Sequence, residues 1–354
     1  MQAVVCYGPE DYRIEEREVP EPAAGEVVIR VRSVGICASD LKCFQGAPLF
    51  WGDEHREGYC QTPVIPGHEF VGEVVALGEG ADKKYGLQLG DFAVSEQIVP
   101  CWNCRFCRRG QYWMCHEKHD VYGFKHTTFG AMAEYMRFPT GAINHKVPES
   151  IPTNHAAYIE PLACAIHAVD RGDIQLDDVV VIAGCGPIGL GMVAAARMKN
   201  PRVLIALDFN GSRLSIAKMC GADIVLNPGE VDVVKEVTEL TEGYGCDVYI
   251  EATGHPSAVE QGLRMIRKLG TFVEFSVMRE QVTVDWTIIG DTKELTIHGS
   301  HLSPYTYPIA IRMLEEGKLP MDKIVTHHLP LTSFHEGVAM VADGKKSIKV
   351  TLTP

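Results

Sequence analysis

The rhythm of hydrophobic positions changes near residue 155. Before that point, short runs of alternating residues are interrupted by glycines and prolines. In residues 25–37 (GEVVIRVRSVGIC), Val27, Ile29 and Val31 alternate with Val28, Arg30 and Arg32, which predicts a half-buried strand. Residues 70–80 and 91–100 have a similar pattern, and residues 46–67 predict a long loop. This part of the chain is therefore expected to be a β-rich domain.

After residue 155, hydrophobic strands alternate with helical segments. An alanine-rich helix is predicted over residues 154–172, and six strands follow with helices between them: 178–184, 202–208, 222–227, 246–253, 270–277 and 294–300. This alternation predicts an α/β fold with a doubly wound parallel sheet. After about residue 298 the pattern is irregular again, and that segment is expected to pack back on the first domain.

Composition and charge narrow the class of protein. The 354 residues, of which 46% are hydrophobic and 22% charged, suffice for two globular domains. The first residues lack the features of a secretion signal, and no apolar stretch approaches about 18 residues, so a soluble cytoplasmic protein that spans no membrane is expected. The formal net charge of −13 argues against nucleic acid or an anionic membrane as the main partner.

Four cysteines in the spacing C-x2-C-x2-C-x7-C give a strong local signal. They are Cys101, Cys104, Cys107 and Cys115, four of the chain's 12 cysteines. Scattered thiols or two disulfides are the alternatives, but the clustering and the absence of a secretion signal favour a metal. Four thiolates saturate one tetrahedral zinc ion, so this site is predicted to stabilise a loop and to leave catalysis to other residues.

A glycine-rich turn follows the first strand of the second domain. Its fingerprint G-x-G-x-x-G is formed by Gly184, Gly186, Pro187, Ile188 and Gly189 around Cys185. Glycines allow a tight turn and a close approach to pyrophosphate, while the next helix offers N–H donors to the phosphates.

An acid stands where such a nucleotide site would need it. Asp208 ends the second predicted strand, 208 − 189 = 19 residues after Gly189, close to the spacing of a ribose-binding acid. An ordinary turn acid is the alternative. The context predicts a dinucleotide site in which Asp208 favours NAD over NADP, although Arg213 is placed where an arginine sometimes accommodates the 2′-phosphate of NADP.

A second group of residues has the composition of an open metal site. Cys37, His68, and either Glu69 or Glu160 could bind a catalytic zinc that keeps one position for water or substrate. Taken singly, such a cysteine or histidine is more often a core residue, and a buried glutamate is more often salt-bridged.

Together these motifs resemble the zinc-containing medium-chain alcohol dehydrogenases. The run G-H-E-x2-G-x5-G from Gly67, the four cysteines and GCGPIG occur in that family's order and cover essentially the whole chain. The resemblance implies a GroES-like catalytic domain over 1–155 and 298–354, with the structural zinc loop at about 95–120, and a Rossmann NAD-binding domain over 156–297. It also implies two zinc ions per chain and a homo-oligomer, either a tetramer or a dimer.

The sequence around Glu160 resembles one branch of that family. Glu160-Pro161-Leu162 is similar to the sorbitol-dehydrogenase-like branch, in which a glutamate replaces a cysteine ligand. Cys164 is the competing ligand and is interpreted as a core residue. The runs FWGDE, VIPGHEFVG, SEQIVPCW, RGQYWMC and VTVDW look like bacterial dehydrogenases of four-carbon polyols, the erythritol/threitol type. The resemblance therefore implies a small polyol substrate and a ketose product such as erythrulose.

The same resemblance suggests roles for further residues. Ser39 occupies the proton-relay position, with a backbone cap as its alternative role, and Lys42 or water would take the last proton. Glu160 would bind zinc directly or through water. The nicotinamide is expected near Phe275, Ser276, Val277, Ser300 and His301. An arginine typical of sorbitol dehydrogenases is replaced by Leu302, which argues against sorbitol itself.

Three alternatives remain open at this stage. Trp51, Asp53, Glu54 and His55 could line a polar substrate pocket or belong to a solvated loop over 47–62. A xylitol, arabitol, sorbitol or threonine dehydrogenase is the competing enzyme. A nucleotide-binding protein of the same fold without catalysis is the competing class, and the intact metal-ligand set argues against it.

Overall fold

The alternating run at residues 25–37 forms β3 (Val27–Gly35), the central strand of a seven-stranded sheet. The structure is a computed structural model that describes residues 1–118, 120–278 and 280–354. The other strands of this sheet are β6 (Glu69–Leu77), β7 (Phe92–Ser95), β10 (Tyr135–Phe138), β11 (Asn144–Val147), β18 (Val325–Pro330) and β19 (Lys349–Thr353). Their order is β11-β7-β6-β3-β19-β18, with β10 also paired to β3. Ile29 and Val31 are buried and Arg30 between them is exposed, as the alternation predicts, but Val28 is buried as well, so the strand is covered on both faces at its start.

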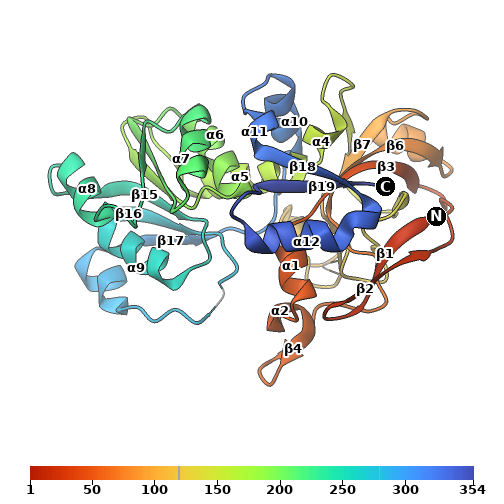
Figure 1. Ribbon diagram of the computed structural model, residues 1–354, viewed down its shortest axis with the longest axis horizontal. Coiled ribbons are helices and arrows are strands. Elements are labelled where there is room, and N and C mark those ends of the chain that lie inside the picture. The colour runs from red at the N-terminus through yellow and green to blue at the C-terminus, as the bar shows by residue number, and fades with distance from the viewer. Residues whose placement is uncertain (119, 279) are drawn as a thin grey trace. The chain divides into compact units, whose positions relative to one another are not determined.

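The C-terminal segment completes this sheet. β19 pairs with β3 through Leu352 opposite Val34, and Figure 1 shows the dark blue β19 running to the red β3. Leu352 and Phe334 share one hydrophobic cluster with Ile29. The helical elements of this segment are α10 (Tyr307–Glu315), α11 (Met321–Ile324), η4 (Leu331–Ser333) and α12 (Phe334–Asp343). The first and last parts of the chain therefore bury a common core.

Short elements surround the sheet. They are β1 (Gln2–Gly8), β2 (Asp11–Glu16), α1 (Ala38–Phe44), α2 (Pro48–Trp51), β4 (Gly52–Asp53), β5 (Arg56–Glu57), α3 (Ala81–Tyr85), β8 (Ile98–Val99), η1 (Cys107–Arg109), η2 (Tyr112–Met114), β9 (Asp120–Val121) and α4 (Thr153–Ala156).

Two expectations for this part of the chain need correction. The predicted loop over 46–67 contains the helix α2 and the β4–β5 hairpin, and the indole of Trp51 anchors them by donating to the Cys43 carbonyl at 2.7 Å. The predicted strand over 91–100 is divided between β7 and β8. The division falls at Glu96, whose buried carboxylate accepts a hydrogen bond from the Tyr112 hydroxyl at 2.6 Å instead of facing water.

The six predicted strands form a parallel sheet in the order β14-β13-β12-β15-β16-β17, which confirms the doubly wound fold. Figure 1 shows helices α6 and α7 on one side of the sheet and α9 on the other. The elements are α5 (Ile159–Arg171), β12 (Val179–Ala183), α6 (Pro187–Met198), β13 (Val203–Leu207), α7 (Gly211–Met219), β14 (Ile224–Leu226), α8 (Val233–Leu240), β15 (Cys246–Glu251), α9 (Pro256–Met265), β16 (Ile266–Glu274), the π-helix η3 (Ile288–Thr292) and β17 (Thr296–Gly299).

The helix predicted over 154–172 is broken into α4 and α5. Pro161 has no N–H with which to continue a helix from Thr153, and the chain turns at Ala157 and Tyr158 before α5 begins. The break leaves Glu160 in the first turn of a new helix.

Two units divide the described residues. The first contains Met1–Glu160, Tyr307–Glu316 and Val325–Pro354, and the second contains Pro161–Thr306 and Gly317–Ile324. The domain boundaries predicted at residues 155 and 298 remain predictions, because compact units need not fold independently.

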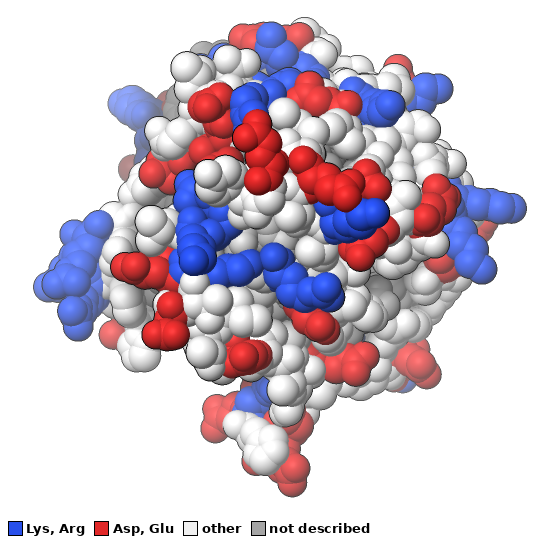
Figure 2. All heavy atoms as spheres, turned by 90° about the vertical axis from the view of Figure 1, so that its left-hand side faces the viewer, with Lys and Arg blue, Asp and Glu red and all other residues white. Residues whose placement is uncertain are grey.

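Acidic and basic side chains are interspersed on the face shown in Figure 2, so neither sign of charge covers it. Within the described residues, every helix is too short or too polar to cross a bilayer.

Candidate functional site

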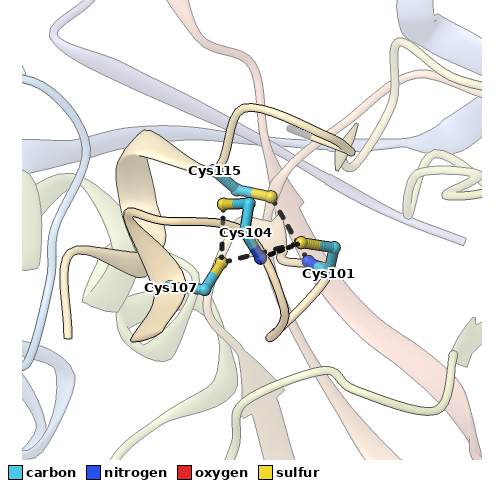
Figure 3. Close-up of side chains that lie close together, drawn as sticks. All are labelled: Cys101, Cys104, Cys107 and Cys115. Carbon is cyan, nitrogen blue, oxygen red and sulfur yellow. Dashed lines mark hydrogen bonds between the residues drawn. The ribbon is translucent and has the colours of Figure 1, made fainter. Parts of the chain in front are cut away.

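Four cysteine side chains converge in the loop that contains η1 and η2 (Figure 3). The sulfur atoms of Cys101, Cys104, Cys107 and Cys115 all lie within 4.8 Å of one another. The Cys107 sulfur is 3.5 Å from that of Cys104 and 3.9 Å from that of Cys101. Tetrahedral zinc with four bonds of about 2.3 Å has sulfur–sulfur edges of about 3.8 Å. The four side chains therefore fit a closed zinc site.

Backbone amides donate hydrogen bonds to the sulfur atoms of Cys101, Cys104 and Cys115. The Cys101 N–H donates to the Cys115 sulfur at 3.3 Å, and the Cys104 N–H donates to the Cys101 sulfur at 3.2 Å. The N–H groups of Cys107 and His116 lower the pKa of the Cys104 thiol to about 6. Thiolate is the form that binds metal, so the amides favour ligation at Cys104, whereas burial raises the pKa of the Cys107 thiol to about 12.

The pairing of β3 with β6 brings a second donor group together. Gly35, the last residue of β3, lies opposite Glu69, the first residue of β6. Cys37 follows β3 by two residues, and His68 immediately precedes β6. The ligand atoms of Cys37, His68 and Glu69 lie within 4.8 Å of one another, and His68 and Glu69 are buried. A thiol, an imidazole and a carboxylate are all zinc ligands, so this set fits that metal.

Asp40 positions two of these residues and was missed in the sequence. Its buried carboxylate accepts a hydrogen bond from the Cys37 N–H at 2.9 Å and approaches His68 Nδ1 to 3.7 Å. Burial raises the pKa of Asp40, and His68 opposes the shift. Burial also acts to lower the pKa of His68, but the charges of Asp40, Cys37 and Glu160 outweigh burial and raise that pKa. An acid three residues after a helix cap is the local signal that could have revealed Asp40.

Lys349 holds the carboxylate of Glu69 from the far end of the chain. Its ammonium nitrogen lies 2.5 Å from Glu69 Oε2 and donates to the Ile36 carbonyl at 3.2 Å, and both charged side chains are almost fully buried. Burial acts to lower the pKa of Lys349, but Glu69 and Cys37 outweigh it and raise that pKa. Glu69 Oε1 has no hydrogen-bond partner among the described residues, so one oxygen remains to face the Cys37–His68 pair.

Glu160 lies in the first turn of α5 and is buried. Its charge acts on His68 and on Lys349, but its oxygens do not belong to the group of ligand atoms found among the described residues. Cys164, the competing candidate, is buried one turn later in α5. Glu69 is thus grouped with the other two donors, whereas Glu160 acts on His68 through its charge.

Ser39 and Lys42 share α1 with the cap residue Cys37. The Ser39 hydroxyl oxygen is 3.4 Å from His68 Nε2, so the hydroxyl borders the donor group. Lys42 follows three residues later, which places it on the same side of the helix as Ser39. Ser39 therefore lies beside His68, and Lys42 lies about one turn further along the same side of α1.

The glycine-rich turn is sterically demanding. Gly184 has φ +99°, and a Cβ at this position would lie 2.8 Å from the Ala252 carbonyl oxygen. A Cβ on Gly189 would lie 1.8 Å from the Gly184 carbonyl oxygen, so a larger residue would push α6 away from β12. Gly186 caps α6, whose first helical residue is Pro187, with Ile188 following. The free N–H groups and the positive end of this 12-residue helix suit a pyrophosphate.

Asp208 lies at the carboxyl end of β13 and braces this turn. Its Oδ2 accepts a hydrogen bond from the Cys185 N–H at 2.8 Å, and its Oδ1 accepts one from Asn210 N–H at 2.7 Å. Burial, with Asp208 and Cys220, raises the pKa of Cys185, and Arg213 opposes that shift from α7. Asp208 therefore contacts the turn directly, and Arg213 acts on the same residue, Cys185, through its charge.

The residues expected near the nicotinamide follow β16 and β17. Phe275, Ser276 and Val277 come directly after β16, and Ser300 follows β17. The Ser300 N–H donates to the Glu274 carbonyl at 2.9 Å, while His301 is exposed. They lie at the carboxyl ends of parallel strands, where ligands of doubly wound sheets bind.

The hairpin in loop 47–62 is not grouped with the metal donors. Asp53 pairs with Arg56 at 3.2 Å. Glu54 and His55 have side chains that are 84% and 76% exposed and pair with each other at 3.2 Å. These contacts favour a solvated loop for Glu54 and His55.

Two family models match the chain. The model described as "Alcohol dehydrogenase GroES-like domain" matches residues 23–149, and the model described as "Zinc-binding dehydrogenase" matches residues 187–316. Together they cover more than half of the sequence and correspond to the β-rich and the doubly wound parts.

Several relatives match over almost their whole length. An erythritol/L-threitol dehydrogenase of Mycolicibacterium smegmatis is 58% identical over all of this chain and 98% of its own. An L-threonine 3-dehydrogenase of Pyrococcus horikoshii is 37% identical over 96% of this chain and 93% of its own.

Two solved structures with the same fold contain different cofactors, one NADH and the other NADP. A short chain alcohol dehydrogenase of Escherichia coli CFT073, complexed with NADH, has a TM-score of 0.87 and 28% identity, covering 100% of this chain and 99% of its own. A zinc-binding dehydrogenase of Sinorhizobium meliloti 1021, bound to NADP, has a TM-score of 0.89 and 26% identity with the same coverage.

The buried Lys349–Glu69 pair makes a stability prediction. Lys349→Met should lower the free energy of unfolding by about 3–5 kcal/mol, because it leaves a buried carboxylate without its cation. Urea denaturation of the purified protein measures the change. Lys199→Met is the matched control, since its 2.6 Å pair with Asp170 is exposed and should contribute less than about 1 kcal/mol. Equal effects of the two substitutions would contradict the assigned role.

Proposed function

This chain is a dehydrogenase that belongs to the zinc-binding alcohol dehydrogenase family, and we propose that it oxidises a secondary alcohol of a small polyol, of the erythritol or threitol type, with NAD. The carbinol carbon loses a hydride to NAD and the hydroxyl loses a proton, so the products are a ketose such as erythrulose, NADH and H⁺. The observation that carries the substrate class is the 58% identity to an erythritol/L-threitol dehydrogenase over the whole chain.

We assign two zinc ions to the chain, one to each donor group. The four thiols of the cysteine loop would hold the structural ion. Cys37 and His68, with Glu69 or Glu160, would hold the catalytic ion. When bound there, zinc supplies Lewis acidity that lowers the pKa of an alcohol.

The chain's own side chains would then handle the proton. The Ser39 hydroxyl borders His68 at 3.4 Å and can accept the proton from the substrate hydroxyl while donating its own. Lys42 on the same side of α1, or water, would carry the proton onward. Asp40 keeps Cys37 and His68 in place through its contacts with both residues.

NAD is the cofactor that Asp208 supports. A carboxylate at the end of the second strand accepts hydrogen bonds from the ribose hydroxyls and repels a 2′-phosphate. The neighbouring Arg213 is the feature that would instead favour NADP, and relatives of this fold are known with either cofactor. The glycine-rich turn and the carboxyl ends of β16 and β17 would hold the remainder of the dinucleotide.

We further infer a cytoplasmic homo-oligomer, a tetramer or a dimer. The oligomer is inferred from the resemblance to the family, and the compartment from the 12 cysteines, which suit a reducing environment. Size-exclusion chromatography with light scattering tests the assembly. A monomer at micromolar concentration would reject it.

The function is tested by a substrate panel. Purified protein is mixed with NAD and, separately, with erythritol, the threitols, xylitol, sorbitol, threonine and ethanol, and NADH absorbance is followed. The highest kcat/KM is expected for a four-carbon polyol. Activity on threonine alone would favour the second candidate, an L-threonine 3-dehydrogenase, which the 37% identity to such an enzyme makes the principal competitor.

Metal removal should separate the two zinc sites. His68→Ala is expected to lower the zinc content from about two ions per chain to about one and to abolish oxidation, while the fold is retained. Cys104→Ser is the matched variant, which should lose the other ion and make residues 95–120 sensitive to protease. Elemental analysis and limited proteolysis measure both outcomes. A His68→Ala protein that retains two ions would contradict the assignment.

Asp208 should determine the choice of dinucleotide. Asp208→Ala is expected to lower the ratio of kcat/KM for NAD to that for NADP by about tenfold or more, because a charged hydrogen-bond acceptor contributes about 1.5–3 kcal/mol. Asp208→Asn keeps an acceptor for the Cys185 N–H but removes the repulsion of the 2′-phosphate, so it should gain activity with NADP. An unchanged ratio in both variants would rule out this role.

A further inference from the structure

Two acids end neighbouring strands of the parallel sheet. Glu251 is the last residue of β15, Glu274 is the last residue of β16, and the two are direct register partners. Side chains at paired positions of adjacent strands point to the same face of a sheet. Glu251 is fully buried and Glu274 is partly buried, so the two carboxyl groups share a space with little water.

Each acid caps the loop that follows its own strand. Glu251 Oε1 accepts hydrogen bonds from the N–H groups of Thr253 at 2.7 Å and Gly254 at 3.0 Å. The Glu274 carboxylate accepts one from the Ser276 N–H. The other oxygens, Glu251 Oε2 and Glu274 Oε1, are both buried and have no hydrogen-bond partner among the described residues. A proton between the two carboxyl groups would satisfy both atoms at once.

The capped loops are in contact. A Cβ on Gly254 would lie 3.0 Å from the Val277 carbonyl oxygen and 3.5 Å from the Ser276 Cβ, so the loop after β15 reaches the loop after β16. The Ser300 N–H, after β17, donates to the Glu274 carbonyl. The acid pair thus lies beneath the three loops at the carboxyl ends of these strands.

The electrostatics favour a neutral Glu274. Burial, followed by the charge of Glu251, raises the pKa of Glu274 to about 8, and the Ser276 N–H opposes the shift. On β15, burial and both acids raise the pKa of Tyr249, which keeps that hydroxyl neutral. On β17, His298 pairs with Arg171 of α5 at 2.9 Å. At the start of α9, His255 pairs with the Ser257 hydroxyl at 2.8 Å.

We propose that Glu274 is protonated at neutral pH and donates a hydrogen bond to Glu251, and that this shared proton positions loops 252–255 and 275–277 to bind NAD. The part concerning NAD rests on the proposed function. Glu274 is a positioning residue in this scheme, because it acts through the loops. Its neutral form is favoured below about pH 8 and is lost as the pH rises through that value. Above it, two adjacent buried carboxylates repel each other and the loops separate.

The proton itself is tested without any ligand. The infrared difference spectrum of the whole protein, recorded between about pH 6 and about pH 10, should contain the C=O band of a protonated carboxyl group. Glu274→Gln should remove a component of that band, because the amide occupies the same place but does not titrate in this range. Glu260→Gln, an exposed acid on α9, should leave the band unchanged. A band unchanged by Glu274→Gln would overturn the proposal.

The positioning role is tested by NAD binding over the same pH range. If the ionised pair binds weakly, the dissociation constant of the unmodified protein should rise by up to about tenfold for each pH unit above about 8. Glu274→Gln still donates to Glu251 and should give a flat profile, whereas Glu274→Leu should bind weakly at every pH. If the dissociation constants of the unmodified protein and of Glu274→Gln change with pH in the same way, Glu274 does not position the loops. If NAD does not bind at any pH, the proposed cofactor is wrong. The infrared band then still shows whether Glu274 carries the shared proton.

Discussion

The antiparallel pairing of β3 with β6 is the constraint on which the candidate catalytic site depends. It places the end of one strand opposite the start of the other, so Cys37 and His68 meet although 31 positions separate them (68 − 37). A shift of one residue in this register would turn every side chain of one strand to the opposite face. The buried Ile29 and Val31 of β3 oppose such a shift, because they would exchange faces with the exposed Arg30. Core packing and metal-donor geometry therefore depend on the same register.

Buried charge around the donors is balanced by specific partners. Glu69 forms an ion pair with Lys349. Asp40 accepts a hydrogen bond from the Cys37 N–H and lies near His68. Removing one member of a buried pair costs more than the pair contributes, so such groups maintain one arrangement against alternatives. In the second unit, a different solution operates at Glu251 and Glu274, where neutralisation by a proton takes the place of a cation. Both solutions hold polar side chains rigidly without exposing them to water.

Local patterns in the sequence predicted the fold better than the details of the site. The six strands of the second unit and the cysteine loop depend on periodicity and spacing, which short segments contain. The Lys349–Glu69 contact joins residues 280 positions apart and has no local signal. The hairpin after Trp51 depends on a hydrogen bond to Cys43, and the meeting of Glu251 with Glu274 depends on strand register. Asp40 is the exception, because its spacing from Cys37 is a readable helix-cap pattern.

The return of β19 to β3 has a consequence for biosynthesis. At about 5–20 residues per second, a ribosome reaches Lys349 roughly 14–56 seconds after it has added Glu69. During that interval the nascent β3–β6 pair lacks both its neighbouring strand and the cation for its buried carboxylate. The first unit is therefore expected to finish folding after the second unit has been synthesised, and chaperones that shield unpaired strand edges would act in this interval.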